Sequence, residues 1–479
     1  MPARTGEQFL KGLRNPREVW VDGERVRDVV SHPKLCGAAH ALAEIYDLQH
    51  VHKETCLMPD PETGEPIPVS HMIPRSREDL AKRAKALRAV AEYSVGLMGR
   101  TPDYMNVTYA GFAGRPDEWG AHGNEAGAER LIAYQKFLRR NDISLTHTIV
   151  QPTVDKALGD APAAGNEQAL HKVGETEHGI VVRGARVLAT LAPFADEIAV
   201  YPALPLPQGS DAYALSFCIP MSTPGLKFLC RDSFSAPGSR FDYPLSSRFD
   251  EQDAFVIFDD VEVPRDRLFI DCNLKSYNTV MTTSWTANAY QQTMIRASVK
   301  LDFAWGVALR MAASINAADS ETMRLIGEVW SYAELTRLAV IAAESEAQEW
   351  PSGLWTCARG PLHVLRGILP VWFPRVNEIL RLIGSHNVFC APTAAQMADQ
   401  ELRPLIDRYL PGAKGMPAEE RIRIFRLAWD FAGSALASRN EQYERFYLAS
   451  SARNMARHLG FTDRSRADRL VDRFLKEPY

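Results

Sequence analysis

Apolar positions recur every three to four residues along the first 140 residues of the chain. Between residues 76 and 99, six apolar side chains fall on one face of a helix: Leu80, Ala84, Leu87, Ala91, Val95 and Met98. Ser76, followed three positions later by Asp79, is typical of a capping box, and Gly99 predicts the end of this helix. Residues 35–50 and 124–139 follow the same pattern, so we expect this region to be mainly helical.

The pattern changes between about residues 148 and 270. Short runs rich in β-branched and aromatic residues alternate with Gly, Pro, Asp and Ser: "GIVVRGARVLAT", "DEIAVYPAL", "AYALSFCIPM" and "AFVIFDDVEVP". We expect these runs to form the strands of a compact sheet or barrel.

Helical periodicity returns after residue 275. Residues 421–447 keep one apolar stripe and predict a long helix of a bundle. An order of helices, strands and helices does not fit the alternation of strands and helices in a Rossmann fold. The predicted domains are residues 1–145, helical, residues 146–272, a β domain, and residues 273–479, a helical bundle.

Composition and charge narrow the functional class. The chain of 479 residues has 46% hydrophobic and 24% charged residues, and it contains no run of about 18 uncharged apolar residues. The first residues lack a secretory pattern, so a soluble, cytoplasmic protein is expected. The net charge of -4 and scattered basic residues argue against nucleic acid as a partner, and no membrane contact is expected. Seven cysteines without a Cys-x-x-Cys spacing predict neither a disulfide framework nor a metal site.

Common catalytic motifs are missing from the chain. Gly-x-Gly, the phosphate-binding loop, Gly-x-Ser-x-Gly and His-Glu-x-x-His do not occur. These absences argue against a Rossmann nicotinamide site, an α/β-hydrolase and a zinc protease.

The stretch "GRTPDYMN", residues 99–106, places a cation and a phenol beside a proline. Pro102 fixes its own φ and restrains Thr101, so Arg100 and Tyr104 are expected on a stiff loop. A solvated turn with an ion pair between Arg100 and Asp103 is the simpler interpretation.

Two further segments place polar residues beside apolar runs. In "LTHTIVQPTVDK", residues 145–156, His147 fits a hydrogen-bonded core residue as well as an acid or base. In "VRGARVLATLAPFADE", residues 182–197, a turn at Gly184 leads into a strand that ends at Thr190, where threonine also fits plain β-propensity.

These three segments, in this order, resemble the large oxygenase component of 4-hydroxyphenylacetate 3-monooxygenase, a family of two-component FADH2-dependent phenol hydroxylases. The likeness extends over nearly the whole chain through "TGEQFLKGL", "VDGERVRDVVSHP", "LMGRTPDY", "GIVVRGARVLAT", "FDYPLSSRFDEQDAFVIFDDV" and "FRLAWDFAGSALASRNEQYERF".

The resemblance implies an α+β, mainly α fold similar to that of acyl-CoA dehydrogenases, with an N-terminal helical domain, a middle β domain and a C-terminal four-helix bundle. It implies reduced FAD as the cofactor, O2 as the co-substrate, a separate NAD(P)H:flavin reductase and a homotetramer. The implied reaction is ortho-hydroxylation of a phenol to a catechol through a flavin C4a-hydroperoxide.

The same resemblance assigns roles to single residues. Arg100, always protonated, would stabilise the phenolate, Tyr104 would donate a hydrogen bond, and His147 would accept or polarise the phenol proton. Thr190 would lie at flavin N5. The implied cofactor contacts are His147, Thr148, Gln151, Thr153, Val154, Asp155, Lys156, Thr190, Ser450, Ser451 and Arg453.

The chain departs from the family pattern at two places. Gln151 stands where these enzymes often have Asn, and Ala203 and Leu204 stand where they have a Ser-Thr pair that holds the substrate carboxylate. Hydrogen bonds to a charged group contribute about 1.5–3 kcal/mol, so their loss should weaken the binding of a substrate carboxylate. With Ala and Leu at these positions, this end of the pocket is expected to be apolar. This favours a phenol without a carboxylate, a halophenol, or a larger tyrosine-derived substrate whose tail leaves the pocket.

Two alternatives remain open at this point. A flavoenzyme like 4-hydroxybutyryl-CoA dehydratase would need cysteine and histidine ligands for an iron–sulfur cluster, and no cysteine lies between residues 57 and 217. A non-catalytic helical assembly protein would keep the fold without the chemistry.

Overall fold

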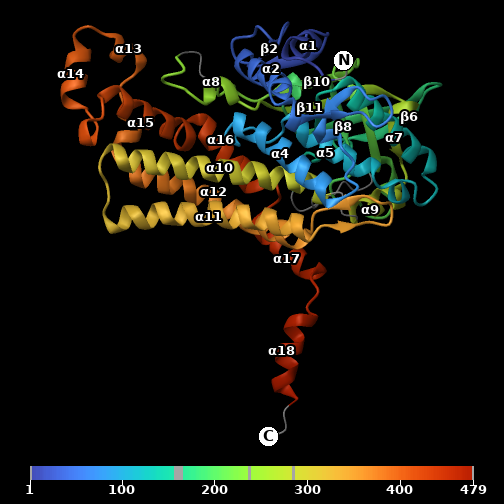
Figure 1. The fold of residues 1–479 in the computed structure, drawn as a ribbon. Coiled ribbons are helices and arrows are strands. Elements are labelled where there is room, and N and C mark those ends of the chain that lie inside the picture. The colour runs from blue at the N-terminus through green and yellow to red at the C-terminus, as the bar shows by residue number, and fades with distance from the viewer. Residues whose placement is uncertain (1–2, 156–164, 236–238, 283–285, 477–479) are drawn as a thin grey trace.

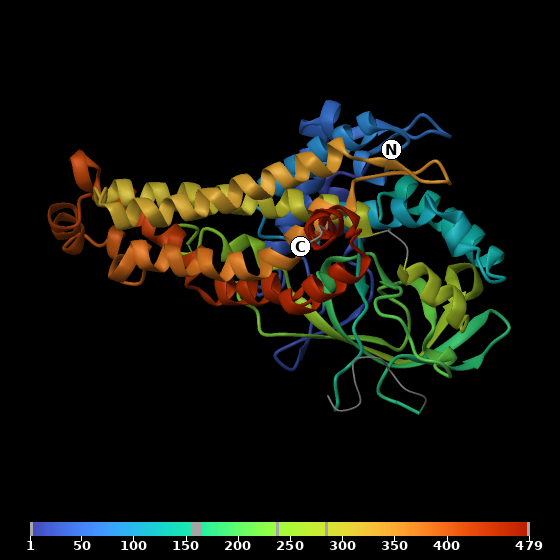
Figure 2. The ribbon, with the colours of Figure 1, turned by 90° about the horizontal axis from the view of Figure 1, so that it is seen from below.

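The computed structural model describes residues 3–155, 165–235, 239–282 and 286–476 (Figure 1). Within them the fold is mixed α/β and mostly helical. The long helices lie side by side in an elongated bundle, and the strands and N-terminal helices gather at one end of it (Figures 1 and 2).

The first part of the chain is largely helical. Its helices are α1 Gly6–Gly12, α2 Cys36–Val51, α3 Lys53–Cys56, α4 Arg77–Tyr93, α5 Pro102–Ala113, α6 Pro116–Trp119 and α7 Glu125–Asn141. The predictions for residues 35–50 and 124–139 are thus confirmed by α2 and α7. A short hairpin of β3 (Leu57–Pro59) and β4 (Pro66–Pro68) interrupts the helices.

Helix α4 begins as predicted and ends earlier than predicted. Oγ of Ser76 accepts a hydrogen bond from the N–H of Asp79 (3.1 Å), as expected of an N-cap. The helix ends at Tyr93 instead of Gly99, because Val95 and Gly96 have positive φ angles of 48° and 71°. Glycine enters this region freely, so Gly96, not Gly99, turns the chain here.

Two sheets follow. The larger has the order β2-β1-β10-β11-β7-β6, and the smaller has the order β12-β9-β8-β5. Their bounds are β1 Glu18–Val21, β2 Glu24–Arg25, β5 Leu145–Thr148, β6 His171–Glu175, β7 Gly179–Thr190, β8 Glu197–Val200, β9 Leu215–Pro220, β10 Leu226–Cys230, β11 Asp253–Pro264 and β12 Leu268–Asp271. All four predicted β runs contain strands. In addition, β1 from the N-terminal part pairs in parallel with β10.

The pairing of β7 with β11 and of β5 with β8 positions the polar residues discussed below. Thr190 at the end of β7 lies opposite Asp253 at the start of β11. His147 in β5 lies opposite Ala199 in β8. Oγ1 of Thr146 donates to the carbonyl of Thr190 (2.6 Å), which ties the end of β7 to β5.

The C-terminal part is helical apart from the short pair β13 Gln348–Glu349 and β14 Trp355–Thr356. Its helices are α9 Leu274–Thr282, α10 Thr286–Ser314, α11 Ser320–Ser345, α12 Arg359–Gly384, α13 Ala394–Ala398, α14 Leu402–Tyr409, α15 Ala418–Ala432, α16 Ala435–Phe446, α17 Ser451–Phe461 and α18 Ser465–Leu475; the short α8 Ser246–Phe249 precedes them. The prediction of one helix over residues 421–447 is wrong, since α15 and α16 are separated at Gly433 and Ser434 caps α16.

None of the helices in the described ranges is both long and apolar enough to span a bilayer. One continuous core cluster joins the N-terminal helices, the sheets and the bundle. A second cluster, which includes Tyr104, Tyr109, Tyr134 and Tyr201, lies around α5, α7 and the smaller sheet.

Candidate active site

The guanidinium of Arg100 lies among three tyrosine rings from two distant parts of the chain. Its Cζ is 4.0 Å from the ring centroid of Tyr104 on α5, 4.6 Å from that of Tyr447 and 5.7 Å from that of Tyr443 on α16. A cation over aromatic faces at these distances is attracted by the ring quadrupoles. Burial alone would lower the pKa of Arg100, but the surrounding tyrosines outweigh it and the pKa is raised.

One hydrogen-bond donor in this group is unused. Nη1 of Arg100 is buried and finds no partner among the residues that the structure describes, and the same is true of the Tyr443 hydroxyl and of Oγ1 of Thr148. Buried polar groups are normally hydrogen-bonded, so the two orphaned atoms of Arg100 and Tyr443 in one aromatic group indicate a place for a polar ligand.

His147 extends the same group. Its ring stacks on Tyr104 with centroids 5.5 Å apart and lies 5.5 Å from Tyr201, which follows β8. Burial, and then the charge of Arg100, hold the pKa of His147 well below its ordinary value, so the imidazole is neutral and one ring nitrogen can accept a hydrogen bond. The structure therefore brings Arg100 and Tyr104 of one segment together with His147 of another.

The turn that carries Arg100 differs from the sequence-based expectation in two ways. Pro102 is the first residue of α5, so Tyr104 stands in a helix and not on a loop. Asp103 is buried and accepts hydrogen bonds from Thr101 (2.5 Å) and Gln292 (3.4 Å). The interpretation of a solvated turn with an ion pair between Arg100 and Asp103 is therefore wrong.

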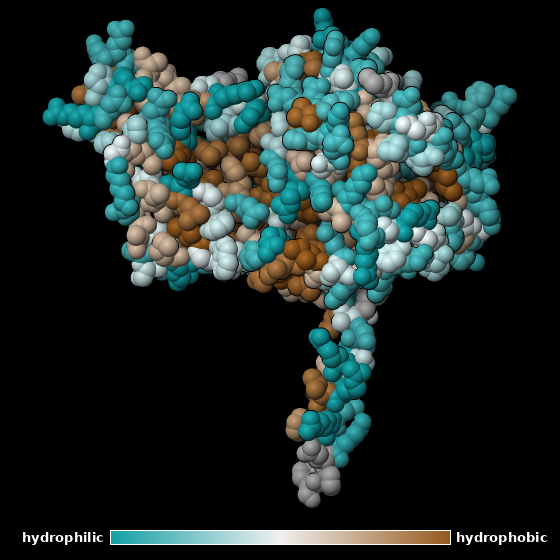
Figure 3. Space-filling model, viewed as in Figure 1, coloured by the Kyte–Doolittle hydropathy of each residue, from teal (hydrophilic) through white to brown (hydrophobic). Residues whose placement is uncertain are grey.

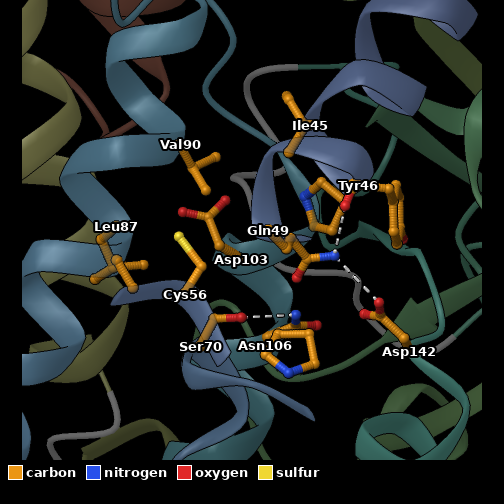
Figure 4. Close-up of a pocket in the computed structure, with 13 residues that line it drawn as sticks. Ile45, Tyr46, Gln49, Cys56, Ser70, Leu87, Val90, Asp103, Asn106 and Asp142 are labelled. Carbon is orange, nitrogen blue, oxygen red and sulfur yellow. Dashed lines mark hydrogen bonds between the residues drawn. The ribbon is translucent and has the colours of Figure 1, made fainter. Parts of the chain in front are cut away.

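A small cavity lies against α5 (Figure 4). It has a volume of about 30 Å³ and is lined by Asp103 and Asn106 of α5 together with Gln49, Cys56 and Ser70. Burial raises the pKa of Asp103 to about 6. A space of this size holds one or two water molecules, so this cavity is not the place for a flavin.

The other predicted cofactor contacts before residue 200 lie either at or just beyond the ends of β5 and β7 or in the exposed segment that follows Gln151 and Pro152. Thr148 and Thr190 are buried at the ends of their strands, and Oε1 of Gln151 accepts a hydrogen bond from the N–H of Leu170 (3.2 Å). Thr153, Val154 and Asp155 are exposed just beyond them, and Lys156 lies outside the described residues.

The C-terminal candidates, Ser450, Ser451 and Arg453, lie at the start of helix α17. Oγ of Ser450 caps α17 by accepting from the N–H of Arg453 (3.4 Å), and Oγ of Ser451 donates to the carbonyl of Gly367 on α12 (2.5 Å). The side chain of Arg453 is exposed. These residues follow Tyr447 closely, and the structure does not place their side chains in the group around Arg100.

Ala203 and Leu204 are half-buried and lie two and three residues beyond Tyr201. The ring of Tyr201 lies 5.5 Å from His147, so this segment follows directly on a member of the aromatic group. The two apolar side chains offer no hydrogen bond to a carboxylate.

Sequence reasoning missed three aromatic members of this site, Tyr201, Tyr443 and Tyr447. It also missed Glu251, which accepts a hydrogen bond from the N–H of Arg100 (2.5 Å), and Arg439, which donates to Glu251 and Asp253. Tyr443 and Tyr447 are four residues apart in "NEQYERFYL", a spacing that places two rings on one helix face. Their ring centroids are 4.5 Å apart. That spacing was the available signal.

Gly99 leaves room for this stack, and this close approach explains the glycine. A Cβ added at Gly99 would lie 2.8 Å from Cζ of Tyr443, whose ring is stacked and buried. We expect Gly99→Ala to displace Tyr443, to lower the free energy of unfolding by about 1–3 kcal/mol and to disturb the position of Arg100. Urea denaturation measures the first effect.

Gly327→Ala on α11 is the matched control, because a Cβ there meets nothing within 4 Å. It should be neutral or should stabilise by about 0.5–1 kcal/mol, as alanine does in a helix. Equal stability of Gly99→Ala and the unchanged protein would show that Tyr443 gives way freely.

Comparison with known proteins gives the family. The model of the 4-hydroxyphenylacetate 3-hydroxylase N terminal matches residues 5–270, and that of the C terminal matches residues 277–476. The 4-hydroxyphenylacetate 3-monooxygenase oxygenase component of Thermus thermophilus is 37% identical over 94% of this chain and 93% of its own. The chain therefore belongs to the 4-hydroxyphenylacetate 3-hydroxylase family.

Solved structures agree with this assignment. A crystal structure of the oxygenase component (HpaB) of 4-hydroxyphenylacetate 3-monooxygenase, complexed with FAD and 4-hydroxyphenylacetate, has a TM-score of 0.94 and 35% identity, and covers 99% of this chain and 98% of that chain. An archaeal 4-hydroxybutyryl-CoA dehydratase from N. maritimus has a TM-score of 0.85 at 20% identity, covering 95% of this chain and 91% of that one. At that identity the second likeness shows a shared fold alone.

Proposed function

We propose that this chain is the oxygenase component of a two-component, FAD-dependent monooxygenase that hydroxylates a phenol at the ortho position to give a catechol. The observation that carries the proposal is Nη1 of Arg100, which is buried beside the neutral ring of His147 and has no hydrogen-bond partner within the described part of the chain. Membership of the family and the FAD complex of the similar structure support it.

Three side chains would act on the phenol oxygen. The fixed charge of Arg100 stabilises the phenolate, the hydroxyl of Tyr104 donates a hydrogen bond to it, and the neutral imidazole of His147 accepts or polarises the phenol proton. Lowering a phenol pKa from about 10 to about 7 requires roughly 4 kcal/mol. One charged contact of about 1.5–3 kcal/mol and one or two neutral contacts of about 1 kcal/mol each supply that amount.

The residues present fit FAD in the reduced form. Oγ1 of Thr148 is buried without a partner among the described residues, and Thr190 ends a strand beside it. We propose that His147, Thr148 and Gln151 with the exposed run from Thr153 line the cofactor, that Thr190 lies at N5, and that the segment around Ser450, Ser451 and Arg453 closes the far side. When bound, reduced FAD supplies with O2 the electrophilic oxygen that the phenol receives.

The substrate is proposed to lack a short carboxylate tail. Ala203 and Leu204, two and three residues after Tyr201, have no hydrogen-bond donor in their side chains. The similar structure contains 4-hydroxyphenylacetate, which carries such a tail. We therefore expect simple phenols, halophenols or larger tyrosine-derived phenols to be better substrates here than 4-hydroxyphenylacetate.

A panel of phenols tests this function. The purified protein receives reduced FAD from an NAD(P)H:flavin reductase in air, and both catechol and hydrogen peroxide are measured. We expect catechol from a phenol without a carboxylate, with a higher kcat/KM than 4-hydroxyphenylacetate gives. Formation of peroxide alone with every phenol would overturn the proposed hydroxylation, and a preference for 4-hydroxyphenylacetate would overturn the proposed specificity.

We also propose an assembly and a domain division. The domains are residues 1–145, 146–272 and 273–479 of an acyl-CoA dehydrogenase-like fold, and the protein is expected to work in the cytoplasm with a separate reductase. A homotetramer is expected from the resemblance to the family. Helix α18 supports an assembly, because it projects from the body and exposes Leu470, Val471, Phe474 and Leu475 (Figures 1 and 3).

We propose that neighbouring subunits also bury the exposed apolar residues of α11 and α12. They are Met323, Trp330, Leu335, Leu338, Ile341, Val364, Val371 and Leu382. We expect the full chain to be a tetramer by light scattering and a chain ending before residue 465 to form smaller species. A monomeric full chain at micromolar concentration would contradict this assembly.

A further inference from the structure

Arg439 on α16 holds two carboxylates that precede and begin β11. Its Nη1 donates to Oε2 of Glu251 (3.0 Å), while Nε and Nη2 donate to the two oxygens of Asp253 (2.8 and 2.6 Å). All three side chains are buried. The cluster therefore joins the C-terminal helices to the sheet in the interior of the protein.

Asp253 has no free acceptor position left. Besides Arg439, Nε of Arg231 donates to Oδ2 (2.9 Å) and Oγ1 of Thr190 donates to Oδ1 (2.8 Å). Burial alone would raise the pKa of Asp253, but Arg439 and Arg231 outweigh it and lower the pKa. Asp253 is thus a carboxylate, which can only accept, so the single hydroxyl hydrogen of Thr190 is committed to it.

This commitment fixes what Thr190 can offer to a ligand. With its hydrogen directed at Asp253, the hydroxyl oxygen has only lone pairs for any other partner. Reduced flavin carries a hydrogen on N5 and can donate to such an oxygen, whereas N5 of oxidised flavin has no hydrogen and needs a donor. The direction of one hydrogen bond would therefore distinguish the two redox states.

We propose that Asp253, held by Arg439 and Arg231, is a positioning residue that keeps the Thr190 hydroxyl as an acceptor for flavin N5–H and so favours reduced over oxidised FAD. This inference rests on the proposed function, which places Thr190 at N5. Asp253 itself acts through Thr190 and does not touch the reacting atoms.

The same anchor reaches the substrate side. Oε1 of Glu251 accepts a hydrogen bond from the backbone N–H of Arg100 (2.5 Å), and Glu251 is fully buried. One guanidinium, that of Arg439, thus holds both the acceptor at N5 and the turn that carries Arg100. The relative positions of the two are set by one cluster of charges.

Thr190→Val tests the proposal by binding alone. Valine keeps the shape of threonine and removes the hydroxyl. We expect the Kd for reduced FAD, titrated without oxygen, to rise about fivefold, since one neutral hydrogen bond is lost. The Kd for oxidised FAD should stay within about twofold, because N5 of that form has no hydrogen and makes no hydrogen bond to Thr190 that the substitution could remove.

The two affinities also predict a redox potential. A fivefold loss for the reduced form alone lowers the midpoint potential of bound FAD by about 20 mV, because a tenfold change corresponds to 29.6 mV in a two-electron couple. Thr190→Ser keeps the hydroxyl and is the matched control, with both affinities and the potential expected to remain unchanged.

Asp253→Asn tests the other end of the bond. An asparagine amide can donate to Thr190 and release the hydroxyl hydrogen toward N5. We expect oxidised FAD to bind about fivefold tighter to this variant than to the unchanged protein. If this variant does not fold, because Arg439 and Arg231 have lost their negatively charged partner, the FAD titrations of Thr190→Val test the proposal without it.

The outcomes separate the two proposals. If Thr190→Val weakens oxidised FAD as much as reduced FAD, Thr190 acts as a donor and the inference is overturned while the flavin site stands. If the unchanged protein binds neither form, the proposed function fails and this inference fails with it. Loss of affinity for the reduced form alone supports both.

Discussion

Arg100→Ala is expected to lower kcat for phenol hydroxylation by about 100- to 1,000-fold, the usual cost of removing a group that stabilises developing negative charge. The alanine variant keeps the aromatic rings and His147 but loses the fixed charge that they surround. Reduced FAD should still bind with nearly unchanged affinity, and consumption of O2 should continue with hydrogen peroxide as the product. Catechol and peroxide measured in one reaction, with a separate flavin titration, check both statements.

Two variants calibrate this loss. Arg100→Lys keeps a positive charge but not the planar fork, so its kcat should fall between those of the alanine variant and the unchanged protein. Arg183→Ala removes an exposed arginine on β7 that pairs with Asp260 on β11, and it should leave hydroxylation unaffected. A kcat for Arg100→Ala equal to that of the unchanged protein would show that Arg100 does not stabilise the reacting phenol.

The helices and strands of this chain were predictable where one period ran without interruption. Helices α2 and α7 and strands β7 and β11 bury one face, and their apolar spacing shows it. The break between α15 and α16 was hidden because both helices pack on α12, so the apolar stripe continues across Gly433. The true signal was Ser434, whose Oγ caps the new helix by accepting from the N–H of Ala437 (3.1 Å).

The site was predictable only in part. Arg100, Tyr104 and His147 were recognised through segments that resemble a family, and the structure brings their side chains together. The partners Tyr443, Tyr447 and Arg439 come from a helix more than 300 residues away, and local pattern says nothing about such contacts. Gly99 was misread for a similar reason, since its need for space arises from Tyr443 and not from its own turn.

Behind the aromatic group lies a buried charge triad that supports α10 and α16. Glu444 accepts hydrogen bonds from Nη1 and Nη2 of Arg296 (2.7 and 2.9 Å) and from Nζ of Lys300 (2.9 Å). Nη1 of Arg296 also donates to the carbonyl of Gly96 (2.8 Å), at the turn that precedes Arg100. Burial, which outweighs the attraction of Glu444, lowers the pKa of Lys300, whereas Glu444 holds the pKa of Arg296 above its ordinary value.

Glu444→Gln is expected to lower the free energy of unfolding by about 3–5 kcal/mol, because it leaves two buried cations without a counter-charge. Urea denaturation at pH 7 measures this loss. Glu334→Gln on α11 is the matched control: it removes one carboxylate from an exposed pair with Arg337, and the expected loss is under about 1 kcal/mol.

The triad also predicts how stability depends on pH. Burial alone would raise the pKa of Glu444, but Arg296 and Lys300 outweigh it and lower the pKa from 4.5 to about 2. A lowered carboxyl pKa stabilises the fold fully above the ordinary value, and this contribution is lost as the pH falls toward the folded value. The difference in stability between the unchanged protein and Glu444→Gln should therefore be largest above about pH 5 and should shrink toward pH 2. A constant difference across that range would show that folding does not shift the pKa of Glu444, and the support it gives to the turn before Arg100 would then need another source.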